Sequence, residues 1–136
     1  MPKAWCKHYR GMYEKTSCEA GVKFKDLPHY GTAEFRTTCP CFGPSSSPCE
    51  KAEYPTAEEL AAEEARLTQE IAKIGQARKA IVESIGGPWK RGKPAAYGTI
   101  DCPVCEKKRT LNFSRFSYNG HIHARCDTPG CVAWME

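Results

Sequence analysis

Four cysteines near the C-terminal end restrict the fold of this chain more than any other feature. Cys102 and Cys105 form a C-x2-C pair, and Cys126 and Cys131 follow after an insert of 20 residues. This arrangement is typical of zinc sites, in which four thiolates bind Zn²⁺ tetrahedrally at about 2.3 Å. The second pair is separated by four residues, so its turn should be looser than in most such sites. Because four thiolates leave no position for a water molecule, we expect a structural zinc ion rather than a catalytic one.

Five more cysteines lie in the first 50 residues, at Cys6, Cys18, Cys39, Cys41 and Cys49. Their spacing is irregular, and the favoured interpretation is a second site with four thiolate ligands, giving two zinc ions per chain. Cys39 and Cys41 flank Pro40, and we expect that only one of the two binds the ion. An iron-sulfur cluster, which four cysteines also hold, is an alternative, as are free structural thiols or a redox pair.

The composition gives a reason for metal. The 136 residues include nine cysteines but five phenylalanines, and small domains with little apolar material usually need metal or disulfides to stay folded. No apolar run has the length of a signal peptide or a membrane span, so we expect a cytoplasmic protein without membrane contact. Disulfides are rare in the cytoplasm, which favours metal ligands.

The middle of the sequence predicts one long helix, over residues 56–86. Thr56 and Glu59 form a capping box at its start, and a Gly-Gly-Pro run follows its end. One narrow apolar stripe runs along it, spaced by seven: Leu60, Leu67, Ile74 and Ile81. The stripe packs either on the chain's own terminal modules or on a second copy, as a short coiled-coil homodimer.

These signals divide the chain into four parts. We expect an N-terminal cysteine module over 1–55, the helix over 56–86, a basic linker rich in Gly and Pro over 87–99, and a zinc ribbon over 100–136. The predicted fold class is therefore a small, metal-stabilised α+β protein.

Within the ribbon, Asn119 and Gly120 predict a β-hairpin with a two-residue type I′ turn. That turn would pair Tyr118 with His121 and Phe116 with His123, placing aromatic rings, histidines and an arginine on one surface. Rings beside cations suit single-stranded nucleic acid or a flipped base. The candidate contact residues are Lys107, Lys108, Arg109, Phe116, Tyr118, His121, His123 and Arg125. The alternative is that the aromatic rings pack on the helix and the histidines are solvated.

Patterns typical of enzymes are missing from the sequence. It has no H-x-E with P-C-x-x-C as in zinc deaminases, no H-E-x-x-H, no phosphate-binding glycine loop and no G-x-S-x-G. We therefore expect no enzymatic activity. The net charge of +4 does not argue for nucleic acid, because two tetrathiolate zinc sites at about −2 each would cancel it.

Several ordered motifs suggest a family. The segments "CKHYRGMYEKTSCEAGVKFKDL", "CPCFGPSSSPCEKAEYPTAEELAAEEARL" and "NGHIHARCDTPGCVAWME" together span much of the chain. Taken together, the chain resembles a group of short, cysteine-rich bacteriophage and prophage proteins with a zinc-ribbon tail. The resemblance implies that the protein acts in the cytoplasm of a bacterial host. It also implies that Cys41, rather than Cys39, binds the N-terminal metal ion together with Cys6, Cys18 and Cys49. Glu106 stands where such ribbons often carry Gly, so the first turn should differ in shape here.

Two functions follow as predictions. The first is a phage accessory protein that binds nucleic acid through the ribbon surface. The second is an adaptor or inhibitor that binds a host protein complex, such as the transcription or defence machinery. Both are non-enzymatic binding functions.

Overall fold

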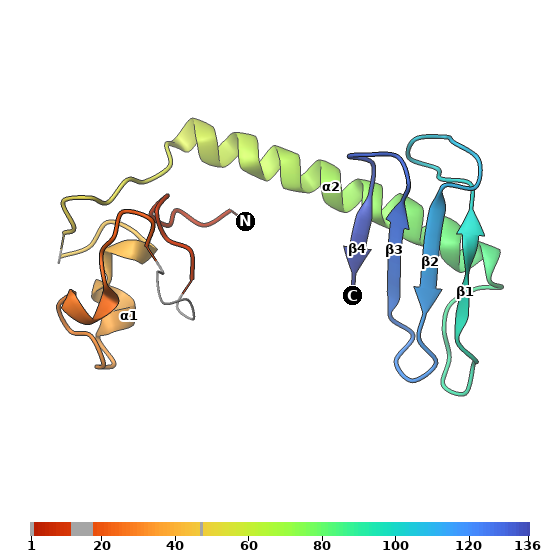
Figure 1. The fold of residues 1–136 in the computed structure, drawn as a ribbon, viewed down its shortest axis with the longest axis horizontal. Helices are drawn as coiled ribbons and strands as arrows, with labels where there is room; N and C mark the ends of the chain where they lie inside the picture. Colours follow the sequence, from red (N-terminus) through yellow and green to blue (C-terminus); the bar gives the residue numbers. More distant parts are fainter. Residues whose placement is uncertain (1, 12–17, 47) are drawn as a thin grey trace. The chain divides into compact units, whose positions relative to one another are not determined.

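The computed structural model describes residues 2–11, 18–46 and 48–136. The chain separates into two compact units, Met1–Ala65 and Arg66–Glu136, which are described here one at a time. One long helix and a four-stranded antiparallel sheet confirm the predicted small α+β class (Figure 1). No helix in the described ranges combines the length and apolar character needed to span a membrane.

Helix α2 (Ala57–Ser84) begins and ends at the residues that encode its limits. At its start, the Thr56 backbone N–H donates to Glu59 Oε2 at 2.8 Å, and the Glu59 N–H donates to Thr56 Oγ1 at 3.2 Å. At its end, the Gly86 N–H donates to the Glu83 carbonyl and the Gly87 N–H to the Val82 carbonyl. Gly86 has a φ of +84°, so this is the Schellman motif that glycine permits.

The sheet contains four strands in the order β1-β2-β3-β4: β1 (Ala96–Ile100), β2 (Leu111–Arg115), β3 (Ile122–Cys126) and β4 (Ala133–Met135) (Figure 1). It is larger than the predicted hairpin. The expectation that residues 96–99 belong to the linker is wrong, because they pair with β2 as part of a strand that follows β2 along its whole length. Tyr97, Thr99 and Ile100 favour a strand, whereas Ala96 and Gly98 do not, and pairing with β2 holds all five in the extended conformation.

The predicted hairpin register is also wrong. Ser114 pairs with His123 and Arg115 with Ile122, a shift of two residues from the expected pairs. The connection is longer than a type I′ turn: the Phe116 N–H donates to the His121 carbonyl, and the Gly120 N–H donates to the Phe116 carbonyl, both at 3.0 Å. Because side chains alternate with a period of two, a shift of two residues leaves every side chain on its predicted face.

The buried face of the sheet packs against α2, whose C-terminal half crosses behind the strands (Figure 1). Ala77 and Ile81 of the helix are fully buried there, and Ile74 packs against the same core. The sheet contributes alternating residues: Leu111, Phe113, Ile122, Ala124 and Cys126. This part of the predicted stripe therefore packs on the chain's own sheet. Ile71, which lies outside the stripe as defined above, is 69% exposed. The homodimer stays a prediction.

The N-terminal unit has little regular structure apart from the start of α2. Among its described residues, the other elements are η1 (Phe24–Asp26), α1 (Phe35–Thr38), η2 (Pro40–Phe42) and an isolated bridge between Tyr9 and Cys18. Its core is a small cluster around Phe35, Cys39 and Cys41.

Candidate functional site

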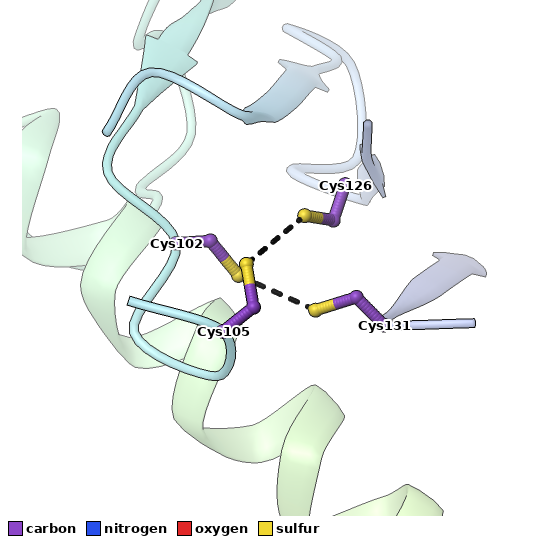
Figure 2. Close-up of side chains that lie close together, drawn as sticks. All are labelled: Cys102, Cys105, Cys126 and Cys131. Carbon is purple, nitrogen blue, oxygen red and sulfur yellow. Dashed lines mark hydrogen bonds between the residues drawn. The ribbon is translucent and has the colours of Figure 1, made fainter. Parts of the chain in front are cut away.

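The four C-terminal cysteines meet at one end of the sheet. Cys102 and Cys105 lie in the connection between β1 and β2, Cys126 ends β3, and Cys131 lies between β3 and β4. All four sulfur atoms lie within 4.8 Å of one another (Figure 2). The Cys102–Cys131 and Cys105–Cys126 sulfur pairs are each 3.7 Å apart. A tetrahedron with metal–sulfur bonds of about 2.3 Å has edges of about 3.8 Å, so the arrangement fits one metal ion. A disulfide would need about 2.05 Å.

The first turn of this metal site uses an unusual residue. The Glu106 N–H donates to the Cys102 carbonyl at 2.9 Å, and the Cys102 N–H donates to the Lys107 carbonyl at 3.0 Å. Glu106 adopts a φ of +60°, the left-handed conformation that glycine takes at lower cost. Arg109 is also left-handed, with a φ of +53°, and its N–H donates to Asp101 Oδ1 at 2.9 Å. The turn thus forms without glycine because hydrogen bonds on both sides hold it.

Two threonines, which the sequence reasoning missed, surround the sulfur atoms. Thr128 Oγ1 lies 3.4 Å from Cys105 Sγ, and the Thr128 N–H donates to Cys126 Sγ at 3.4 Å. Thr110 Oγ1 lies 3.5 Å from Cys126 Sγ. A threonine two residues after a cysteine is a weak signal, because only the closed turn brings its hydroxyl to the neighbouring thiol.

These contacts divide the four thiols into two pairs. The Thr128 hydroxyl, followed by a backbone hydrogen bond at Lys107, lowers the pKa of Cys105 to about 6. Burial is the strongest influence on the pKa of Cys126 and raises it, but hydrogen bonds with Thr110 and Thr128 outweigh burial and lower it. Burial raises the pKa of Cys102 and of Cys131. Lowered pKa values favour the thiolate form of Cys105 and Cys126, and a bound cation would favour it in Cys102 and Cys131 as well.

The opposite side of the sheet is not covered by α2. We call this surface the open face. The strand pairing sets its residues in two rows across the sheet: Tyr97, Ser114, His123, Met135 and Thr99, Asn112, Arg125, Ala133. A hollow of about 640 Å³ lies on the part of this face formed by β2, β3 and β4. Tyr97 and Met135 are 84% and 81% exposed.

Aromatic side chains gather at one end of the open face. Phe116 stacks on Tyr118 with ring centroids 5.7 Å apart and an interplanar angle of 29°. Phe116 also contacts His123 edge to face, at 4.8 Å. These three predicted residues are therefore close together although the predicted register is wrong. Tyr118 is 76% exposed, and His121 is exposed on the adjoining loop.

The basic candidates lie elsewhere on the sheet. Lys107, Lys108 and Arg109 are exposed in the connection that carries the first cysteine pair. Phe116 and Tyr118 follow the other end of β2. The five residues of β2 rise about 3.3 Å each, so this strand separates the aromatic residues from the basic ones by about 17 Å. Arg125 lies between the two groups, exposed on the open face. The predicted contact set thus divides into an aromatic end and a basic end. Tyr97 and Met135 lie on the same face and were missed, because the pairing of β1 and β4 was not foreseen.

The N-terminal cysteines are also enclosed. Cys6, Cys18, Cys39 and Cys41 are buried and Cys49 is half-buried. Across the described residues, however, the C-terminal cysteines are the group whose ligand atoms all lie within 4.8 Å. Burial raises the pKa of Cys41 to about 12, and the neighbouring Cys39, Cys18 and Cys6 add to this effect.

The chain matches none of the protein-family models, curated proteins or solved structures with which it was compared. Its relation to phage proteins therefore stays a prediction, and its function has to be argued from the geometry of the site.

Proposed function

We propose that the C-terminal unit is a zinc ribbon that binds single-stranded nucleic acid through the open face of its sheet. The observation that supports it most is the grouping of the stacked Phe116 and Tyr118 with His123, on a face that also presents exposed Tyr97 and Arg125. The role is binding rather than catalysis.

Zinc is the proposed metal because the four candidate ligands are cysteine sulfur atoms that all lie within 4.8 Å of one another. Tetrahedral sulfur sites favour Zn²⁺ or iron-sulfur clusters, and sulfur atoms 3.7 Å apart suit a single ion. With four protein ligands the ion has no open position, so it holds the turns of the sheet together and activates no water.

The open face suits unpaired bases. Each base has a π-face, so stacking on exposed tyrosine rings contributes about 1–3 kcal/mol per base with little sequence preference. Bases in a duplex are already stacked and would not reach these rings. Lys107, Lys108 and Arg109 stand at the far end of the strands, where they can contact phosphates of a strand that continues past the rings.

Binding is tested by fluorescence anisotropy of labelled single-stranded DNA, single-stranded RNA and duplex DNA with the zinc-loaded full chain. The double variant Tyr97→Ala/Tyr118→Ala should weaken single-strand binding by about 5- to 150-fold per ring. Tyr30→Ala is the matched control, because Tyr30 is 53% exposed in the N-terminal unit. Circular dichroism and zinc content should be unchanged in each variant. The proposal is wrong if Tyr97→Ala/Tyr118→Ala binds as well as Tyr30→Ala, or if the duplex binds more tightly.

The basic residues in the connection between β1 and β2 should affect the salt dependence of binding. Lys107→Ala/Lys108→Ala should weaken binding at low salt and reduce the slope of log Kd against log salt by about 0.7 for each phosphate that these lysines neutralise. Unlike the tyrosine variants, these changes should have little effect at high salt.

A host protein is the second candidate partner. The observation in its favour is the exposure of Met135 on the edge strand β4. Met135 is 81% exposed and lines the hollow together with Ala133. Methionine adapts well to partner surfaces, and an edge strand can pair with an extended peptide. A partner captured from host lysate that survives nuclease and high salt, and is not captured by Met135→Glu, would favour this function over the first.

A further inference from the structure

The N-terminal unit has little regular secondary structure and a small core among its described residues. Its described segments before α2 contain helical turns of three or four residues and one isolated bridge. Its largest buried side chain is Phe35, which packs with Cys39, Cys41 and a few half-buried aromatic rings. Units of this size with so little core usually need covalent or metal links.

Four of the five cysteines in this unit line the same small cavity. The cavity measures about 10 Å³, and its lining includes Cys6, Cys18, Cys41 and Cys49. The rest of its lining is largely apolar, including Val22, Leu27 and Pro40. A space of this size accommodates about one water-sized particle, which is enough for a single ion. A cluster of several iron and sulfide atoms would not fit without opening the unit.

Cys39 is not part of this lining. It is 3% exposed and packs in the core with Phe35 and Cys41. Its side chain forms a hydrogen bond with that of Cys41 but does not line the cavity.

Three of the four cysteines that line the cavity lie at the start of hydrogen-bonded turns. The carbonyls of Cys6, Cys18 and Cys49 each accept a hydrogen bond from the N–H three residues later, at 3.0 Å. The Cys6 N–H donates to the Cys41 carbonyl at 2.9 Å, and the Glu53 N–H donates to Cys6 Sγ at 3.4 Å. These bonds tie segments that are far apart in sequence around the cavity, and one of them already reaches a sulfur atom.

We infer that Cys6, Cys18, Cys41 and Cys49 hold a single divalent metal ion of the zinc class in the N-terminal unit, and that Cys39 is not a ligand. The sulfur atoms of this set do not all lie within 4.8 Å of one another, as those of the C-terminal set do, so binding draws them inward around the cavity. The chain then holds two ions, each fixed by its own four thiolates.

The test is the metal content of the full chain purified without chelator, measured by elemental analysis and native mass spectrometry. Wild type should hold two zinc ions, Cys49→Ser one, and Cys39→Ser two. Cys105→Ser, in the other site, should also hold one. The inference is overturned if wild type holds one ion, or if Cys39→Ser loses an ion as Cys49→Ser does.

Two further measurements separate the removal of a ligand from the loss of the fold. Cys49→His keeps a zinc-binding side chain, so it should restore the second ion that Cys49→Ser lacks, whereas a misfolded unit would not recover it. Counting thiols in denatured, unreduced wild type should give nine, the number of cysteines in the sequence. A lower count would mean disulfides, and a brown protein containing iron and sulfide would mean a cluster; either result overturns the inference.

Discussion

The indole ring of Trp89 lies directly against Gly120. A Cβ atom at Gly120 would come within 2.5 Å of Trp89 Cγ and 2.6 Å of Cδ2. Gly120 is buried and has a φ of +73°, a conformation that costs other residues energy. Trp89 lies in the segment that we expected to be a plain linker, so this contact joins that segment to the β2–β3 connection.

Gly120→Ala should therefore destabilise the C-terminal unit by about 2–6 kcal/mol, since left-handed strain and overpacking each cost about 1–3 kcal/mol. Gly92→Ala is the control, because Gly92 also has a positive φ, +91°, but nothing lies within 4 Å of its Cβ position. We expect that control to lower the free energy of unfolding by about 1 kcal/mol. Thermal and denaturant unfolding measure both, and equal losses of stability would contradict the role of Trp89.

Removing the metal should unfold the C-terminal unit. A strong chelator should lower its melting temperature sharply and abolish the signal of the four-stranded sheet, because binding of a structural metal contributes to folding directly. Cys126→Ser should have the same effect without chelator, since it removes one of four ligands. Circular dichroism with and without chelator measures this, and an unaltered melting curve would show that the thiol cluster needs no metal.

Thr128→Val should weaken metal binding and leave the fold intact. The change removes the hydroxyl that lies 3.4 Å from Cys105 Sγ and is the main cause of that thiol's low pKa. Groups that support metal ligands are typically worth about 10- to 100-fold in affinity. Competition with a chromophoric zinc chelator measures the change. Thr99→Val is the matched control, because Thr99 donates instead to Asn112 Oδ1 at 2.8 Å and should leave affinity unchanged.

The start of α2 should depend on pH through Glu59. The Thr56 backbone N–H, followed by the Lys7 ammonium, lowers the pKa of the Glu59 carboxyl below its ordinary value. Because the pKa of Glu59 is lower in the folded state, its carboxylate stabilises the fold at pH values above the pKa of the unfolded state, about 4.3. This contribution is lost as the pH falls through the folded pKa. Wild type should thus be more stable than Glu59→Gln at pH 7, and the difference should vanish in acid.

An NMR titration of the Glu59 carboxyl carbon checks the shift directly. The midpoint should lie below the ordinary value in wild type and rise in Lys7→Ala, because Lys7 Nζ lies 2.9 Å from Glu59 Oε1. A midpoint at the ordinary value would show that the capping box does not hold the carboxylate.

Local signals explain which features could be predicted. The capping box at Thr56 and the glycines after the helix fix its limits through hydrogen bonds that span three to five residues, so the sequence is enough to place them. The C-terminal cysteine set is similar, because two short turns and one ion leave little choice of partners. The alternation of residues in β2 and β3 predicted the correct faces even though the register was wrong.

The sequence by itself thus determined the long helix, the four-thiolate cluster and which side chains of β2 and β3 turn away from the core. The tertiary structure decided the rest: the hairpin register, the addition of β1 and β4, and the arrival of Tyr97 and Met135 on the open face. The physical reason is that these features depend on contacts between distant segments, such as Trp89 against Gly120, whose energy appears only when both segments are buried together.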